Sequence, residues 1–147
     1  MRIKDEDVVG RYTFPRFLYS DVSSVFFVDG AQSDVYVFDI KSRDIIQTIT
    51  APEHRLSTID SICTYSFSGV RYLFLWNTVE KQCAVFTIYY AAAPYKLFKR
   101  IYWTMPASII KITVETPSKN TPSMDLTFAI LKSNNKTTCL PIDRPVE

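Results

Sequence analysis

The residues that could support catalysis are few and lie far apart in this sequence. The single His, His54, stands beside Arg55 in the stretch APEHRLS, and any Ser-His-Asp or Cys-His arrangement would have to use it. That stretch reads as a loop, so we expect a solvated His rather than a catalytic base. A chain with three Gly residues also has no Gly-rich phosphate-binding loop. We therefore expect no catalytic residue and no cofactor, and the sequence disfavours an enzyme that acts alone.

The three cysteines do not follow the spacing of a metal site. Cys63, Cys83 and Cys139 are separated by long stretches of chain, and each lies in an apolar run, whereas structural zinc sites take their ligands from closely spaced pairs. An odd number of widely spaced cysteines predicts reduced, buried thiols in a cytosolic or nuclear protein rather than a disulfide framework. The acidic run Asp5-Glu6-Asp7 has the composition of a solvated turn, with a cation site as the alternative.

Composition is that of a soluble globular domain. The 147 residues are 47% apolar and 22% charged, which is ordinary for such a domain, and the 14% aromatic content favours strands. A net charge of +2 is too small to indicate a nucleic-acid or membrane surface by itself. No apolar run reaches the roughly 18–20 residues of a membrane span, and residues 1–10 lack the apolar core of a signal peptide. We expect a nuclear or cytoplasmic protein without membrane contact.

Short runs of apolar and aromatic residues, separated by turns, fill the sequence and predict an all-β fold. Asp29-Gly30 is a strong hairpin signal, and no segment carries a sustained helical period. The expected strands cover residues 24–28, 35–40, 45–49, 59–67, 71–76, 83–89, 95–103, 108–114, 124–132 and 137–142.

Internal repetition favours a β-propeller over other all-β folds. VYVFD ends at Asp39 and AVFTI ends at Ile88, each between turns and further strands, and TTCLPI takes the corresponding place later in the chain. Units of four strands with a period of about 40–50 residues are typical of propeller blades. VYVFD resembles the third strand of a WD repeat, with Phe38-Asp39 in place of Trp-Asp. The prediction is a WD40-like partial propeller of about three blades, residues 12–50, 56–104 and 107–143, and a tail, residues 144–147.

Closure is the physical difficulty of this fold. Propellers close with about 4–8 blades, and this chain supplies two and most of a third. An open stack of blades leaves unpaired strand edges that invite association. Three alternatives therefore remain: the chain is part of a larger propeller, something else covers its ends, or the fold is a β-sandwich or barrel.

Two features suit binding. In residues 95–103, Lys96, Lys99 and Arg100 interleave with aromatic residues, and such a strand can contact the phosphates and bases of RNA. The alternative is an outer strand whose charges face solvent and protect an edge. Loops at one face of the propeller, residues 51–57 and 115–123, are the second candidate surface, because loops on a rigid scaffold commonly bind partners.

The N-terminal stretch KDEDVVGRY, residues 4–12, resembles a basic-Asp-Glu, apolar strand, Arg-Tyr stretch of one WD-repeat family. That family is the non-catalytic subunit of tRNA (guanine-N7-)-methyltransferase. Residues 21–49 resemble one of its later blades, and residues 59–115 are similar in strand order and loop length to the blade after it. The resemblance covers residues 4–115 and implies that they correspond to the C-terminal half of the family's propeller. The resemblance implies a seven-bladed scaffold that binds and steadies a catalytic methyltransferase. It also implies no cofactor site in this chain, and tRNA contact through the complex.

The resemblance places the partner contacts at Lys4, Asp5, Glu6 and Arg11. In the family, a basic residue on the strand after the Asp-Glu pair helps to contact the enzyme. Val9 stands near that position here and cannot make a charged contact, so Arg11 replaces it only if the alignment slips.

The functional prediction is a non-catalytic protein-interaction scaffold for a tRNA-modifying methyltransferase. The alternative is a direct RNA-binding β module that uses Lys96, Lys99 and Arg100. A self-contained β-sandwich enzyme is a third possibility and would need a pocket that holds His54 together with a carboxylate.

Overall fold

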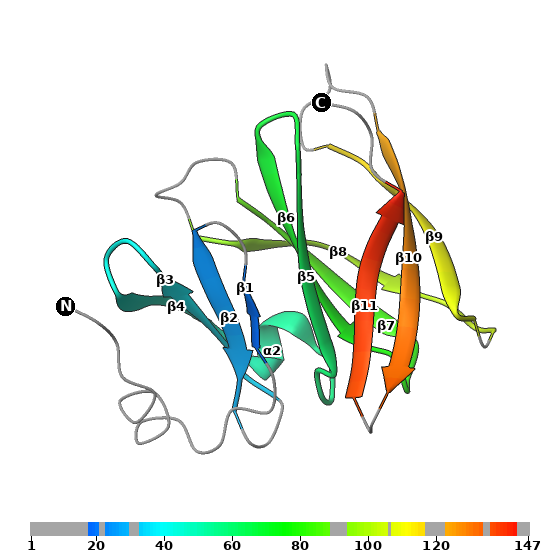
Figure 1. Ribbon diagram of the computed structural model, residues 1–147, viewed down its shortest axis with the longest axis horizontal. Coiled ribbons are helices and arrows are strands. Elements are labelled where there is room, and N and C mark those ends of the chain that lie inside the picture. The colour runs from blue at the N-terminus through cyan, green and yellow to red at the C-terminus, as the bar shows by residue number, and fades with distance from the viewer. Residues whose placement is uncertain are drawn as a thin grey trace.

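The structure, a computed structural model, describes residues 18–20, 23–29, 33–88, 94–105, 107–116, 123–133 and 136–143. These residues form three antiparallel sheets and one short helix, α2 (Ala51–His54) (Figure 1). The first sheet has the order β1-β2-β3-β4, the second β5-β6-β7-β8 and the third β11-β10-β9. The strands are β1 Leu18–Ser20, β2 Ser24–Val28, β3 Val35–Asp39, β4 Asp44–Ile49, β5 Ser61–Phe67, β6 Val70–Asn77, β7 Gln82–Ile88, β8 Lys96–Tyr102, β9 Ile109–Val114, β10 Met124–Ser133 and β11 Lys136–Asp143.

The predicted all-β fold of about three blade-like sheets is confirmed, and the sheets do not close into a barrel. Asp39 ends β3 and Ile88 ends β7, so the two repeated segments lie in different sheets, as neighbouring blades require. The helix α2 has four residues, and no helix in the described part of the chain has the length and apolarity needed to cross a membrane.

The second sheet is the middle layer of the stack. Along β6, Leu73 and Leu75 join the cluster that packs against the first sheet, whereas Tyr72, Phe74 and Trp76 join the cluster shared with the third sheet. Because neighbouring side chains of a strand point to opposite faces, both faces of β6 are buried. This explains why its sequence reads as an almost continuous apolar run rather than an alternating one.

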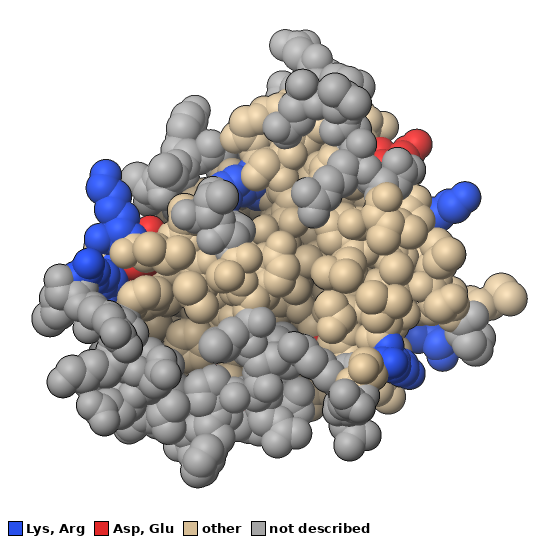
Figure 2. Space-filling model, in the orientation of Figure 1, with Lys and Arg blue, Asp and Glu red and all other residues tan. Residues whose placement is uncertain are grey.

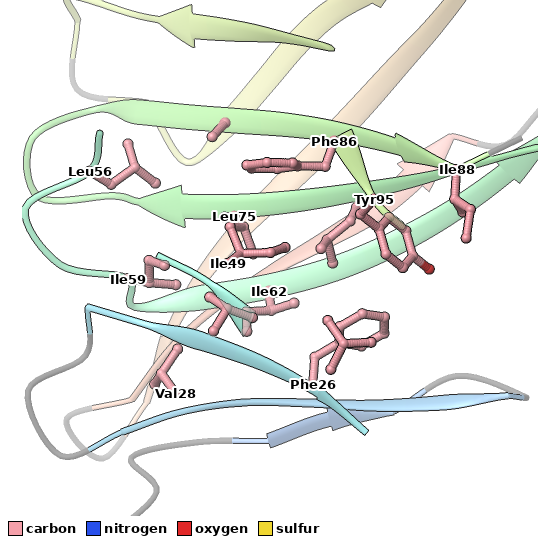
Figure 3. Packing of buried hydrophobic residues seen from close by; sticks show 14 residues of the cluster. Phe26, Val28, Ile49, Leu56, Ile59, Ile62, Leu75, Phe86, Ile88 and Tyr95 are labelled. Carbon is pink, nitrogen blue, oxygen red and sulfur yellow. The ribbon is translucent and has the colours of Figure 1, made fainter. Parts of the chain in front are cut away.

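The first cluster joins the first two sheets. Figure 3 shows Phe26 and Val28 of β2 facing Leu75, Phe86 and Ile88 of the second sheet. Residues of the connecting segment, Leu56 and Ile59, fill one end of this layer, and the ring of Tyr95 meets Phe26 edge-on at 5.8 Å. The second cluster joins the second and third sheets and holds Phe128 against Phe74, with ring centroids 4.9 Å apart.

The three sheets stack face to face, and their edge strands lie above one another in the stack. β1 and β11 both lie beside β5, and the amide of Cys139 donates to Ser61 Oγ at 2.6 Å. At the opposite edges, the Gln47 side chain of β4 exchanges two hydrogen bonds with the backbone of Tyr95, just before β8. Lys99 Nζ of β8 donates to the carbonyl of Thr113 in β9 at 2.6 Å. We call the edges β1, β5 and β11 inner and the edges β4, β8 and β9 outer.

The chain crosses the third sheet in the opposite direction, from the outer edge to the inner edge. The first two sheets begin at the inner edge, but the third begins at the outer edge with β9 and ends at the inner edge with β11. Figure 1 shows β11 beside β5. The expected equivalence of TTCLPI with the third strands β3 and β7 is therefore wrong. Strand spacing alone does not tell on which side of a sheet the chain enters.

The three cysteines, far apart in sequence, converge in the second cluster. Cys63, Cys83 and Cys139 are buried free thiols, as expected from their apolar surroundings. Burial raises the pKa of the Cys83 thiol well above its ordinary value, with a smaller contribution from Cys63 and then Cys139. The described residues contain no group of three or more His, Cys, Asp or Glu arranged to hold a metal ion.

Four residues other than Gly adopt the left-handed backbone conformation in the described part of the chain, three of them basic and the fourth Ser68. Arg43, Arg55 and Lys81 have φ values of 62°, 58° and 57°. An L-residue in this conformation costs about 1–2 kcal/mol because its Cβ approaches the following carbonyl oxygen. In the exposed β3–β4 turn, the amide of Arg43 donates to the carbonyl of Asp39 at 2.8 Å, which closes the turn.

Replacing Arg43 with Gly is expected to stabilise the protein by about 0.5–1 kcal/mol, because relief of the left-handed strain exceeds the added chain entropy of Gly. Urea denaturation measures the change in the free energy of unfolding. Arg43→Ala is the matched control, since it removes the same side chain but keeps Cβ. Equal stability of the Gly and Ala variants would contradict the role of backbone strain.

Candidate protein-interaction surface

The outer face of the third sheet, which points away from the second sheet, carries a row of apolar side chains. The register places Ile109, Ala129 and Leu140 side by side across β9, β10 and β11. Leu131 lies two residues beyond Ala129 on the same face of β10. Ile109 is 54% exposed, Leu131 51% and Leu140 37%. We call Ile109, Ala129, Leu131, Leu140 and Ile142 the third-sheet patch.

Strand periodicity explains why this patch faces outward. In β10, Met124, Leu126 and Phe128 are buried in the second cluster, so Asp125, Thr127 and Ala129 must point the other way. In β11 the irregular pairing opposite Thr127 and Phe128 leaves Ile142 without a direct partner, 56% exposed. An outward face is normally polar when it is solvated, and the third-sheet patch breaks this rule.

The rest of the outer face keeps the polar pattern. Lys111, Thr113, Asp125 and Thr127 line a shallow hollow of about 350 Å³, together with Ile112 and Leu126. Thr113 Oγ1 donates to Asp125 Oδ1 at 2.7 Å. The outer face thus joins an apolar half to a polar half that carries both signs of charge. Contiguous exposed apolar surface with a polar rim is typical of protein-binding sites.

The basic residues of β8 do not form one surface. The register pairs Lys99 with Val85 and Arg100 with Ala84; since Val85 faces the third sheet and Ala84 the first, the two cations leave opposite faces of the strand. Lys99 bonds to Thr113, and the Arg100 guanidinium donates to the carbonyls of Glu53 (3.1 Å) and His54 (3.3 Å). Lys96 is exposed.

Charge on the visible face is likewise divided. Figure 2 shows the Lys and Arg side chains in separate groups, mainly along the margin, and they do not merge into a continuous basic surface. Of the proposed RNA contacts, the structure therefore leaves Lys96 facing solvent, bonds Lys99 to the third sheet and bonds Arg100 to α2.

His54 is buried, and the expectation of a solvated loop His is wrong. It ends α2, and its side chain has 0% exposure. Its Nδ1 accepts from the Leu56 amide at 2.9 Å, so Nε2 carries the proton and donates to the Ser33 carbonyl. The prediction failed because Pro52 and Glu53 have the composition of a turn. In the structure they form the first turn of a capped helix that begins after Thr50.

The segment between β4 and β5 forms hydrogen bonds with a connection of the first sheet and with a turn of the second sheet. His54 holds Ser33 in the β2–β3 connection of the first sheet. Asp60 Oδ2 accepts from the amide and hydroxyl of Thr78, in the β6–β7 turn of the second sheet, at 2.9 and 2.6 Å. Burial raises the pKa of Asp60, and these two bonds act against that rise. Within the predicted binding loop, residues 51–57, His54 and Leu56 are buried in the fold, whereas Glu53, Arg55 and Ser57 are exposed.

The residues that the resemblance places at the partner interface, Lys4, Asp5, Glu6 and Arg11, lie outside the described residues, as does Val9. Of the second predicted loop, residues 115–123, the structure describes Glu115, Thr116 and Ser123.

The sequence was compared with protein-family models and with curated proteins, and neither gave a match.

The third-sheet patch was not predicted from the sequence, although adjacent apolar residues in three strands could have indicated it. SII, AIL and CLPI each place apolar residues next to one another in strands that have only one covered face. In the second sheet such runs indicate a strand buried on both faces. The same pattern can therefore indicate either a strand in a middle sheet or an exposed apolar face on an outermost sheet. Knowledge of which sheet is outermost is needed to separate them.

Because His54 is buried and neutral in the segment that connects the first two sheets, we expect the free energy of unfolding to fall at acid pH. Burial lowers the pKa of His54, and the nearby Arg100 charge adds to this effect. The hydrogen bond to Ser33 and the charges of Asp34 and Glu53 offset the lowering only in part. The unfolded chain therefore binds the proton more readily, and stability falls as pH drops below about 6.5, by up to about 1.4 kcal/mol per pH unit.

Urea denaturation between pH 7.5 and about pH 5, where the ordinary pKa of His is crossed, measures this loss. His54→Gln removes the only His; it keeps a donor toward Ser33 but loses the acceptor for Leu56. We expect this variant to be less stable at pH 7.5 and to show a smaller slope with pH. An unchanged slope would contradict the assignment to His54.

Proposed function

We propose that this chain is a non-catalytic protein-interaction scaffold. The observation that carries the proposal is the third-sheet patch, an exposed apolar surface on a sheet whose other face is fixed in the core. A rigid sheet loses little conformational freedom when it binds a partner, which favours its use as a docking surface.

The partner implied by the resemblance is the catalytic subunit of a tRNA (guanine-N7-)-methyltransferase. Support for this identity comes from the sequence alone, through residues 4–115. Support for protein docking comes from the structure, through the apolar and mixed-charge halves of the outer face. In this proposal, tRNA is contacted mainly through the complex.

The direct RNA-binding alternative has weaker support. Its candidate cations Lys99 and Arg100 project from opposite faces of β8 and bond to backbone carbonyls of neighbouring elements. Single-stranded RNA binding needs cations that follow the phosphates along one groove, with aromatic faces available for stacking. The arrangement of β8 instead suits an outer strand that joins the sheets.

Ile109→Asp is expected to weaken binding of the catalytic methyltransferase subunit of the same organism by about ten- to a hundredfold, since burial of one large aliphatic side chain is worth about 1.5–3 kcal/mol. Surface plasmon resonance on the folded chain measures the affinity. Thermal unfolding of each variant confirms that the fold is retained.

Ile46→Asp is the matched control, because Ile46 is the same residue type and is 52% exposed, but lies in β4 of the first sheet. It is expected to bind as the wild type does. Equal losses in both variants would contradict docking at the third-sheet patch, and absence of wild-type binding would contradict the choice of partner.

A further inference from the structure

A second concave feature lies between the second and third sheets, at the end where the β6–β7 turn approaches the start of β9. It is a groove of about 650 Å³ that neither the apolar patch nor the basic strand includes. We call it the lysine groove. Its walls include Thr78, Lys81, Trp103, Ser108, Ile130 and Lys132.

The lysine groove carries positive charge from two sheets. Lys81 comes from the β6–β7 turn and Lys132 from β10, and none of the described residues that line the groove is a carboxylate. The nearest acidic group that the contacts reveal is Asp60, which lies behind Thr78 and interacts electrostatically with Lys132. Even with Asp60 ionised, the two lysines leave a positive excess, so the groove is complementary to an anion.

The walls of the groove are held in place before any ligand arrives. The amide of Trp103 donates to the carbonyl of Lys81 at 3.2 Å, and the Trp103 ring meets Trp76 edge-on with centroids 5.8 Å apart. Across the groove, the carbonyl of Ser108 accepts from the amide of Ile130 at 2.8 Å. A preformed site binds with a smaller loss of conformational entropy.

The groove lies on the inward face of the third sheet, opposite the third-sheet patch, and the two approach each other at the start of β9 and in the second half of β10. Ser108 and Lys132 line the groove, and their neighbours in sequence, Ile109 and Leu131, belong to the patch. A partner that covers the patch therefore reaches the groove with a segment that passes this end of the third sheet.

We propose that the lysine groove binds an anionic side chain, carboxylate or phosphoryl, on an extended acidic segment of the partner protein. Lys81 and Lys132 supply the charged hydrogen bonds, the Ser108 hydroxyl supplies a further donor, and the indole of Trp103 packs against the segment. This inference rests on the proposed docking function and adds the chemistry of the partner. Two cations in a short groove match one or two anionic groups, whereas RNA requires a longer basic track.

Tryptophan fluorescence of the isolated chain provides the test. The chain has two Trp residues; Trp76 is fully buried and Trp103 lines the groove, so the emission change on binding reports Trp103. The probes are a short oligoglutamate peptide, the same peptide with phosphoserine, and a single-stranded RNA of equal charge. We expect saturable binding of at least one peptide, weakened about tenfold by Lys81→Gln or Lys132→Gln, as expected for loss of one charged hydrogen bond.

Lys111→Gln is the matched control, since it removes one lysine from the opposite face of the third sheet. It is expected to leave peptide affinity unchanged. Tighter binding of the oligoglutamate peptide assigns a carboxylate, and tighter binding of the phosphoserine peptide assigns a phosphoryl group. No saturable peptide binding, equal losses in all three variants, or preference for RNA would overturn the proposal. None of these results would change the outcome expected for Ile109→Asp and Ile46→Asp. Failure of the lysine-groove proposal can therefore be distinguished from failure of the proposed docking function.

Discussion

Burial of β6 and β7 on both faces is the constraint on which the rest of this structure depends. A four-stranded sheet with one apolar face would be satisfied by a single partner layer, but Leu73 and Leu75 require cover on one side and Phe74 and Trp76 on the other. Each large apolar side chain contributes about 1.5–3 kcal/mol when it leaves water. The second sheet therefore demands two neighbours, and the three-layer stack is the arrangement that supplies them.

In the proposed scaffold, an outermost layer provides the docking surface. The first and third sheets each cover the middle sheet with one face and turn the other outward, and on the third sheet that outward face is partly apolar. Polar ties at the edges, from Gln47 to Tyr95 and from Cys139 to Ser61, fix the layers against sliding. The third-sheet patch and the lysine groove are therefore held on a frame whose geometry is set by the core rather than by their own side chains.

Much of the fold could be predicted from sequence. Alternating aromatic runs such as VYVFD, bounded by turns, identify strands because their period of two is local information. The reversed order of the third sheet was not predictable, because the side on which the chain enters a sheet depends on packing between distant segments. The burial of His54 was not predicted for a related reason: its hydrogen-bond partners Ser33 and Arg100 are distant in sequence. The third-sheet patch required knowledge of which layer is outermost, and the residues of the N-terminal resemblance lie outside the described part of the chain.

Native-state hydrogen exchange, residue by residue, tests the central claim most directly. If both faces of the middle sheet are buried, amides of β6 and β7 exchange only when the whole domain unfolds, with an opening free energy equal to the global free energy of unfolding. Amides of β4 and β9, at the outer edges of flanking sheets, then exchange through smaller local openings. Exchange from β6 as fast as that from β4 or β9 would contradict a stack organised around the second sheet.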